Sequence, residues 1–289
     1  MRAGWRDARW PRRGPLSSLS PRRRWYVLAM TTVVLLLGGA TLVGVADEFR
    51  APPRADPEVP GTVVLVPGFG GDVSALNSLA LRLRAAGRRT VLVPLPDNGL
   101  GDLRGQAEAI EDTVAAQIRG GAPSVDLVAY SAGGVATWVW LTDGLHAPSA
   151  RRVVTLGSPL RGAELAAAGS ALLPGTCTPA CRQLAPGSAL LTRLAEAGAP
   201  PGVPWLSIWS RTDDVVTPPD SAQVPGIRDV ALQDLCPDPP STHAGLPIDF
   251  VVIGTLLYAI DRAPTPALGR EDCLRLRTLG TGRPRLSLN

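Results

Sequence analysis

One serine lies where an apolar, strand-like run changes into a helix-like run. The mostly apolar residues Val125–Ala129 precede Tyr130, and Ser131 is followed two residues later by Gly133. Small residues two before and two after a serine let a strand and a helix pack closely around a sharp turn. Such a turn exposes the hydroxyl at the carboxyl edge of a sheet, where α/β proteins bind ligands. The pattern therefore predicts a nucleophile at Ser131, with an alanine where Gly-x-Ser-x-Gly has its first glycine.

The elements that would position this serine alternate along the chain after residue 60. Thr62–Val66 (TVVLV) is a continuous run without charge and rich in β-branched residues, as a strand buried in a parallel sheet should be. We predict strands at Thr62–Val66, Thr90–Val93, Val125–Ala129, Arg152–Leu156, Trp205–Trp209 and Arg228–Leu232, and helices at Ser74–Ala86, Gly105–Arg119, Gly133–Leu141 and Ile248–Ile260. This alternation predicts an α/β fold whose mostly parallel sheet carries helices on both faces.

One region interrupts the alternation. Residues 160–204 are rich in alanine, proline and glycine, and they contain helix-like stretches near Glu164–Ala168 and Ser188–Ala197. An insertion of this kind is either a cap or lid over a site or a surface excursion without a gating role. Both interpretations stay open. The stretch after Cys273 is predicted to be a loose tail.

Four segments together resemble the α/β-hydrolase superfamily, and within it the small bacterial lipases and esterases with an Ala-x-Ser-x-Gly elbow. The resemblance covers roughly residues 61–275, and its segments are Val64–Gly71, Ala129–Gly134, Val154–Pro159 and Ser210–Pro218. They are similar to the family's first strand with its oxyanion loop, its nucleophile elbow, the strand after the elbow, and the loop that carries the catalytic acid. The resemblance implies an α/β-hydrolase fold with a catalytic triad.

In this family the nucleophile, the acid and the histidine follow one another in that order along the chain. There are two histidines, and only His243 lies after the aspartates of the acid loop; His146 lies before them. Asp213 and Asp214 are both candidates for the acid. The family's loop implies Asp213, with Asp214 facing solvent or capping the turn, and Asp234 ranks third.

The oxyanion that forms during acyl transfer needs backbone N–H donors. The resemblance implies the N–H groups of Ala132, directly after the nucleophile, and of Phe69. The family often has His-Gly where this chain has Pro67-Gly68, which leaves the detailed shape of that loop open.

Four cysteines, Cys177, Cys181, Cys236 and Cys273, suggest disulfides in an exported domain. Three pairings are possible. Cys177 and Cys181 could form a local bridge in a proline-flanked loop, and Cys236–Cys273 would then tie the C-terminal region to the body. The alternative is zinc, but a C-x3-C spacing followed by distant cysteines fits common zinc sites poorly.

The N-terminal part reads as a membrane signal. Residues 1–24 carry eight arginines and one aspartate, and the 22 residues Trp25–Ala46 carry no charge. At 1.5 Å per residue, such a helix can cross a hydrocarbon core of about 30 Å. The positive-inside rule predicts that residues 1–24 are a cytoplasmic tail and that the domain at residues 61–289 lies outside the cytoplasm. Residues 25–46 are then either a transmembrane anchor or a cleaved signal peptide, which would leave the domain secreted. Residues 47–60 are predicted to be a proline-rich spacer.

Charge argues against a nucleic-acid binder. The net charge of +4 combines +7 on residues 1–24 with −3 on the remainder, and all 29 basic residues are arginine. The sequence therefore predicts a serine hydrolase that cleaves apolar acyl esters and requires no metal or organic cofactor. Two alternatives remain: a thioesterase, amidase or acyltransferase with the same triad, and a catalytically silent binding module tethered to a membrane.

Overall fold

The computed structural model describes residues 20–48, 54–172, 175–237, 241–261 and 267–282, with the backbone alone for residues 39–48. The chain divides into two compact units, Met1–Ala51 and Pro52–Asn289. Residues 1–19 of the predicted basic tail and residues 49–53 of the predicted spacer lie outside the described residues.

The first unit contains a single described helix, α1 (Pro21–Glu48), which covers the predicted apolar segment. Its described apolar side chains are exposed, Trp25 and Tyr26 among them. In the part of the chain that the structure describes, no helix has both the length and the apolar character needed to cross a membrane. The expected transmembrane helix at residues 25–46 is therefore not supported, although the side chains of residues 39–48 lie outside the described part.

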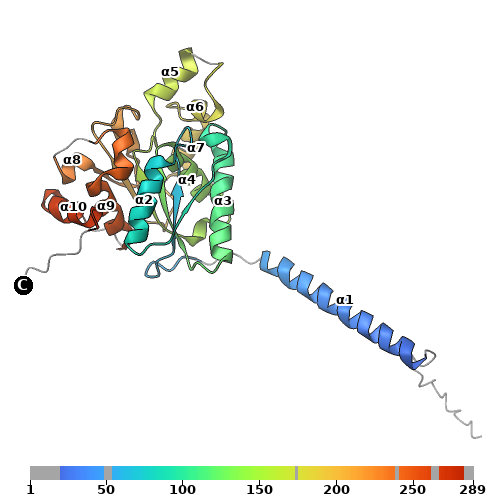
Figure 1. The fold of residues 1–289 in the computed structure, drawn as a ribbon. Coiled ribbons are helices and arrows are strands. Elements are labelled where there is room, and N and C mark those ends of the chain that lie inside the picture. Colours follow the sequence, from blue (N-terminus) through green and yellow to red (C-terminus); the bar gives the residue numbers. More distant parts are fainter. Residues whose placement is uncertain (1–19, 49–53, 173–174, 238–240, 262–266, 283–289) are drawn as a thin grey trace, which may run out of the picture. The chain divides into compact units, whose positions relative to one another are not determined.

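The second unit is built on a parallel sheet of six described strands. Their bounds are β1 (Thr62–Val66), β2 (Thr90–Leu92), β3 (Val125–Tyr130), β4 (Ala150–Leu156), β5 (Trp205–Trp209) and β6 (Arg228–Ala231). The order across the sheet is β2-β1-β3-β4-β5-β6, and every pairing is parallel. The second strand, β2, forms one edge, and the later strands follow one another from β1 to the other edge, which places β3, and Ser131 directly after it, near the middle of the sheet. Figure 1 shows helices on both sides of the sheet.

Helices cover both faces of this sheet, as predicted. The bounds are α2 (Ser74–Ala85), α3 (Leu103–Arg119), α4 (Ala132–Asp143), α5 (Glu164–Leu172), α6 (Pro179–Gln183), α7 (Ala189–Ala197), α8 (Leu232–Leu235), α9 (Phe250–Asp261) and α10 (Cys273–Gly280). Alternate residues of β1 divide between two cores. Val64 packs with α3, α4 and α7 on one face, and Val63 packs with α2 and α9 on the other.

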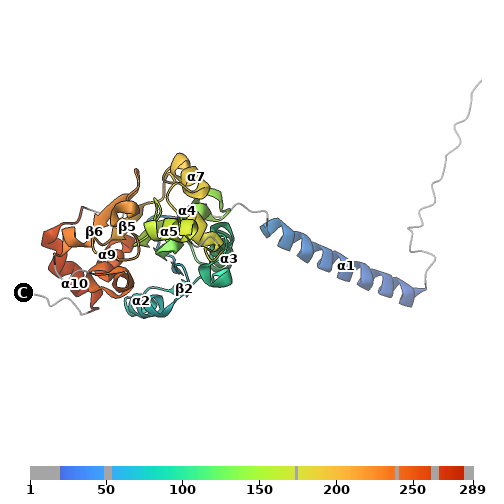
Figure 2. The ribbon, with the colours of Figure 1, turned by 90° about the horizontal axis from the view of Figure 1, so that it is seen from above.

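The interrupting region contains three described helices, α5, α6 and α7. Helix α7 belongs to the main domain, because its Leu190, Leu191 and Leu194 are buried in the same core as Trp138 of α4. Helices α5 and α6 instead lie at the carboxyl ends of the strands, and Figure 2 shows α5 across the middle of the domain in the view from above. Ala180 of α6 is buried in the same core as α7. The name cap is used below for α5, α6 and the described residues between them, and a gating role for this segment stays a prediction.

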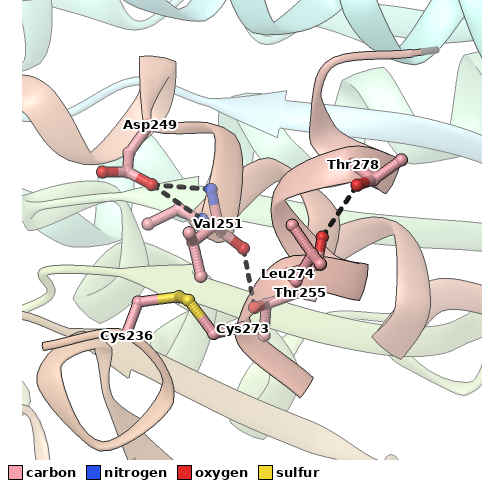
Figure 3. The surroundings of a disulfide bond; sticks show 8 residues. Cys236, Asp249, Val251, Thr255, Cys273, Leu274 and Thr278 are labelled. Atoms are coloured by element: carbon pink, nitrogen blue, oxygen red, sulfur yellow. Dashed lines mark hydrogen bonds between the residues drawn. A yellow bond between two sulfur atoms is a disulfide. The ribbon is translucent and has the colours of Figure 1, made fainter. Parts of the chain in front are cut away.

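The segment after Cys273 is not a loose tail over its described part, so that prediction was wrong there. Residues 273–280 form α10, which packs closely on α9: a Cβ at Gly254 or Gly280 would collide with backbone of the opposite helix. The Cys236–Cys273 disulfide fixes the start of α10, and Asp249 caps α9 by accepting from the N–H of Val251 (Figure 3). Residues 283–289 lie outside the described residues.

The described part of the predicted spacer lies against the domain. The N–H of Ala55 donates to Pro148, and the Ser124 hydroxyl donates to the carbonyl of Val59. The carbonyl of Pro57 accepts from the guanidinium groups of Arg151 and Arg152. The chain therefore enters the sheet at the amino ends of the strands, away from the cap.

Candidate active site

Ser131 has a backbone conformation that few residues adopt. Its φ of 54° and ψ of −129° place it in a strained region, and only Asp97 and Asn98 share a positive φ among the described non-glycine residues. The turn is held between β3 and α4, since a Cβ at Gly133 would collide with the carbonyl oxygen of Pro67. The backbone therefore has the strained strand–turn–helix form of a nucleophile elbow, with the serine side chain at the sheet's carboxyl edge.

His243 lies beside Ser131 at the start of a 3-10 helix, η4 (His243–Ile248). Its Nε2 is 3.0 Å from Ser131 Oγ, and its Nδ1 is 2.8 Å from Asp213 Oδ2. All three residues are buried, with 6 to 8% of each exposed. A carboxylate only accepts hydrogen bonds, so Nδ1 carries the proton and Nε2 is left to accept from the serine hydroxyl.

The neighbouring aspartates both serve the histidine, in different ways. Asp213 Oδ1 accepts from the N–H groups of Val215 (3.0 Å) and Val216 (2.8 Å), which leaves Oδ2 directed at the imidazole. Asp214 Oδ1 accepts from the backbone N–H of His243 at 3.1 Å, so it does not merely face solvent or cap its own turn. Asp234, the third candidate, is exposed and pairs with Arg211.

Tyr130 is a site residue that the sequence interpretation did not single out. Its hydroxyl donates to the carbonyl of His243 at 3.2 Å, and its ring lies 4.9 Å from the imidazole, centroid to centroid. Burial raises the pKa of Tyr130 to about 12, and the negative charges of Asp213, Asp72 and Asp214 act in the same direction. The hydroxyl therefore keeps its proton and remains a donor. The only signal in the sequence was its position next to Ser131.

The second histidine lies elsewhere in the fold. His146 Nδ1 is 2.5 Å from Glu111 Oε1, and Glu111 Oε2 accepts from the indole N–H of Trp140 at 2.6 Å. These contacts tie the end of α4 to α3. His146 is thus engaged in a link between two helices and not with Ser131.

The expected oxyanion donors flank the serine. Ala132 is the first residue of α4, where a helix leaves its N–H groups without a partner inside the helix. Phe69 lies in the turn closed by the N–H of Gly71 and the carbonyl of Gly68. A Cβ at Gly68 would lie 2.8 Å from the Ser131 Cβ, so the absence of a side chain there lets the loop pass close over the serine.

A cavity of about 170 Å³ opens beside Ser131, and apart from the serine its walls are apolar. The lining residues come from the Phe69 loop, the cap and the acid loop: Phe69, Ser131, Pro159, Ala163, Leu165, Ala166, Cys181, Leu184, Val215 and Val216. The sequence interpretation singled out only Phe69, Ser131 and Cys181 of these, because a cavity wall depends on tertiary packing. Within the described residues, no group of three or more His, Cys, Asp or Glu side chains could hold a metal ion.

The four cysteines form two bridges in the structure. Cys177 is joined to Cys181, and Cys236 is joined to Cys273. Of the three pairings that the sequence allows, the structure has the one with a local bridge and a second bridge between distant cysteines. Its first bridge belongs to the cap and its second to the C-terminal helices.

No family model matches the sequence, and no curated protein matches it either. Solved structures do match. Aspergillus fumigatus lipase B is 18% identical with a TM-score of 0.58, over 81% of this chain and 64% of the lipase. Bacillus licheniformis lipase BlEst2 in its propeptide form is 17% identical with a TM-score of 0.59, over 75% of this chain and 54% of that chain. The chain thus spans less than two thirds of the length of these two lipases. Together with the parallel sheet, these likenesses show that the chain has the α/β-hydrolase fold.

Proposed function

We propose that this chain is a serine hydrolase that cleaves carboxylic esters with apolar acyl groups. The observation that carries the proposal is the continuous hydrogen-bonded series from Ser131 through His243 to Asp213 at the strained turn after β3. A serine hydroxyl is a weak nucleophile by itself, and a histidine oriented by a carboxylate is the arrangement that activates it.

In the first half of the reaction, His243 Nε2 takes the proton from Ser131 as Oγ attacks the ester carbonyl. Asp213 holds the imidazole in the required tautomer and stabilises the imidazolium that forms. The N–H groups of Phe69 and Ala132 would donate to the oxyanion, and the N-terminus of α4 favours the same negative charge. The alcohol leaves with the proton from His243, and Ser131 retains the acyl group.

In the second half, His243 removes a proton from water, which attacks the acyl-enzyme. The carboxylic acid is released, and the proton returns to the Ser131 oxygen. Every group in this cycle belongs to the protein, the ester or water. No metal or organic cofactor is required by these steps.

The apolar cavity beside Ser131 supports an apolar acyl group as the substrate's recognised part. Its walls offer an acyl chain burial from water, whereas Ser131 supplies the reacting atom. Lipases among the structures with this fold agree with that substrate class. A thioester or amide would meet the same nucleophile, so ester specificity is part of the proposal.

The test is labelling by a fluorophosphonate probe, which forms a bond with an activated serine. We expect the wild-type chain to be labelled and to hydrolyse p-nitrophenyl esters, whereas Ser131→Ala should do neither. Matched thioester and anilide substrates would identify a thioesterase or an amidase. Failure of the folded wild type to label would contradict the proposal and favour a silent binding module.

We also propose that the catalytic unit lies outside the cytoplasm, either held by residues 25–46 or released after their cleavage. Two disulfides support this placement, because they form and persist in oxidising compartments. Fractionating cells that express the chain, followed by N-terminal sequencing, tests both forms. A membrane fraction with an intact N-terminus indicates an anchor, and a mature N-terminus near Asp47 indicates secretion. Reduced thiols in a cytosolic fraction would contradict the proposal.

A further inference from the structure

The cavity beside Ser131 has an open mouth and a buried floor. Phe69, Leu165 and Val215 form the mouth, and they are 46, 63 and 40% exposed. The floor consists of the buried lining residues, which include Ala163 and Leu184 and also Ser131 and Val216. A chain attached to Ser131 would therefore run between the mouth and this floor.

Backbone contacts of the cap join the segments that carry these buried lining residues. The N–H of Ala163 donates to the carbonyl of Leu184 at 3.0 Å, which joins the start of α5 to the end of α6. The N–H of Glu164 donates to Thr217 at 2.7 Å, which joins α5 to the acid loop. The cavity's length is thus set by segments that are bonded to one another.

Small side chains leave the space that the cavity occupies. Helix α5 presents Ala166 to the cavity, and Cys181 of α6 lines the same wall. Cys181 is held by its disulfide to Cys177, and its Sγ lies against α5 near the carbonyl of Ala166. A larger residue at position 166 would fill the cavity.

From this arrangement, and resting on the function proposed above, we infer that the cap selects esters of short acyl chains, with Ala166 as a specificity-determining residue. An apolar cavity of about 150 Å³ accommodates a six-carbon ring. The cavity of about 170 Å³ therefore has room for an acyl chain of about six carbons. Longer chains must leave their remaining methylenes at the exposed mouth.

The free energy of moving a methylene group from water into an apolar site gives the expected dependence of kcat/KM on acyl-chain length. Burying a methylene favours binding by a factor of about four. The kcat/KM of the wild-type chain should therefore rise with each added carbon and level off near hexanoate. Leucine at position 166 adds three carbon atoms to the wall. The variant should therefore lose the increase in kcat/KM that about three buried methylenes of the substrate provide.

The experiment measures kcat/KM of the full chain for p-nitrophenyl esters from acetate to dodecanoate, with Ala166→Leu and Ala168→Leu as variants. Ala168 lies on the same helix, is exposed and does not line the cavity. Ala166→Leu should lose about sixtyfold on hexanoate and less than about threefold on acetate. Ala168→Leu should follow the wild-type profile.

Several outcomes are distinguishable. Labelling of Ala166→Leu by a small fluorophosphonate at the wild-type rate shows that its serine is still active. If Ala166→Leu does not fold, Ala166→Val adds two carbons and should lose about fifteenfold on hexanoate. Equal losses on acetate and hexanoate, or an unchanged profile, would overturn the inference while leaving the esterase proposal in place. A wild type that hydrolyses no ester would overturn both.

Discussion

At the scale of single residues, the Asp213–Asp214 pair shows how neighbouring side chains of one type can act differently. Successive residues in an extended or turning backbone point in different directions, so only one of the two carboxylates can reach the imidazole. Asp213 contacts the His243 ring, and Asp214 contacts the His243 backbone. The sequence predicted which aspartate would face the ring only through the family resemblance, because spacing alone left both open.

These contacts predict different results from the same substitution. Asp213→Asn should lower kcat for ester hydrolysis by about 10³- to 10⁴-fold, because an amide no longer enforces the required tautomer. Asp214→Asn should stay within about threefold of wild type, since its amide oxygen can still accept from the His243 N–H. Asp214→Ala removes that acceptor and should lose about tenfold. Steady-state measurement of kcat for the three variants tests these expectations. A larger loss of kcat for Asp214→Asn than for Asp213→Asn would make Asp214 the residue that orients the His243 ring.

Tyr130 provides a prediction about pH. Its pKa is about 12 in the folded chain because of burial, against about 10 for an unfolded tyrosine. The unfolded chain therefore loses this proton first, and the stabilising contribution, complete below pH 10, is lost as the pH rises to 12. The sequence contains no lysine and three tyrosines, and no cysteine is free, so few other groups titrate there.

Thermal melting between pH 9 and 12 measures this contribution. The wild-type melting temperature should fall steeply above pH 10, and Tyr130→Phe should show a shallower fall. At pH 8 the variant should lose about 1 kcal/mol, the net value of one hydrogen bond. Parallel curves for the two proteins would show that Tyr130 does not carry the alkaline transition.

At the scale of elements, buried strands were the easiest to predict. The hardest were short helices that form only because they pack against other parts of the chain. The bounds of β1 and β5 match their predictions, since a short, continuous apolar run has few other ways to be buried. Helix α10 was missed because CLRLRTLG is short and only Leu276 and Gly280 of it are buried, so its helical form depends on α9 and on the Cys236–Cys273 bridge. For the cap, the sequence indicated an insertion but not that α7 would join the core.

The two disulfides should differ in their effect on stability. Cys236–Cys273 spans 37 residues and Cys177–Cys181 spans four. Loop-closure entropy predicts losses of about 4 kcal/mol and about 2 kcal/mol when each pair is replaced by serines. Denaturant unfolding of the two double variants measures the difference. The short bridge should instead affect the chain-length profile of ester hydrolysis, and a larger stability loss from it would contradict the loop argument.

At the scale of the whole molecule, the second unit (Pro52–Asn289) has two opposite ends that differ in structure. The cap, the cavity and Ser131 lie at the carboxyl ends of the strands, whereas residues 54–60 join the domain at the amino ends. That second end is built around Arg151, whose guanidinium pairs with the buried Asp126 and also donates to Pro57. A proline-rich composition predicted an extended spacer, but it could not show that the carbonyl of Pro57 would accept hydrogen bonds from the buried arginines Arg151 and Arg152.

This contact network predicts where the folded unit begins. A chain starting at Pro52 keeps the hydrogen bonds from Ala55, Pro57 and Val59 to the domain, and a chain starting at Gly61 loses all of them. Loss of these several net-favourable hydrogen bonds should cost about 2 kcal/mol. Urea unfolding of residues 52–289 and 61–289 compares the two directly. Because Ser131 lies at the opposite end of the strands, both should label equally with fluorophosphonate while folded; equal stability would mean that residues 54–60 contribute nothing to the domain.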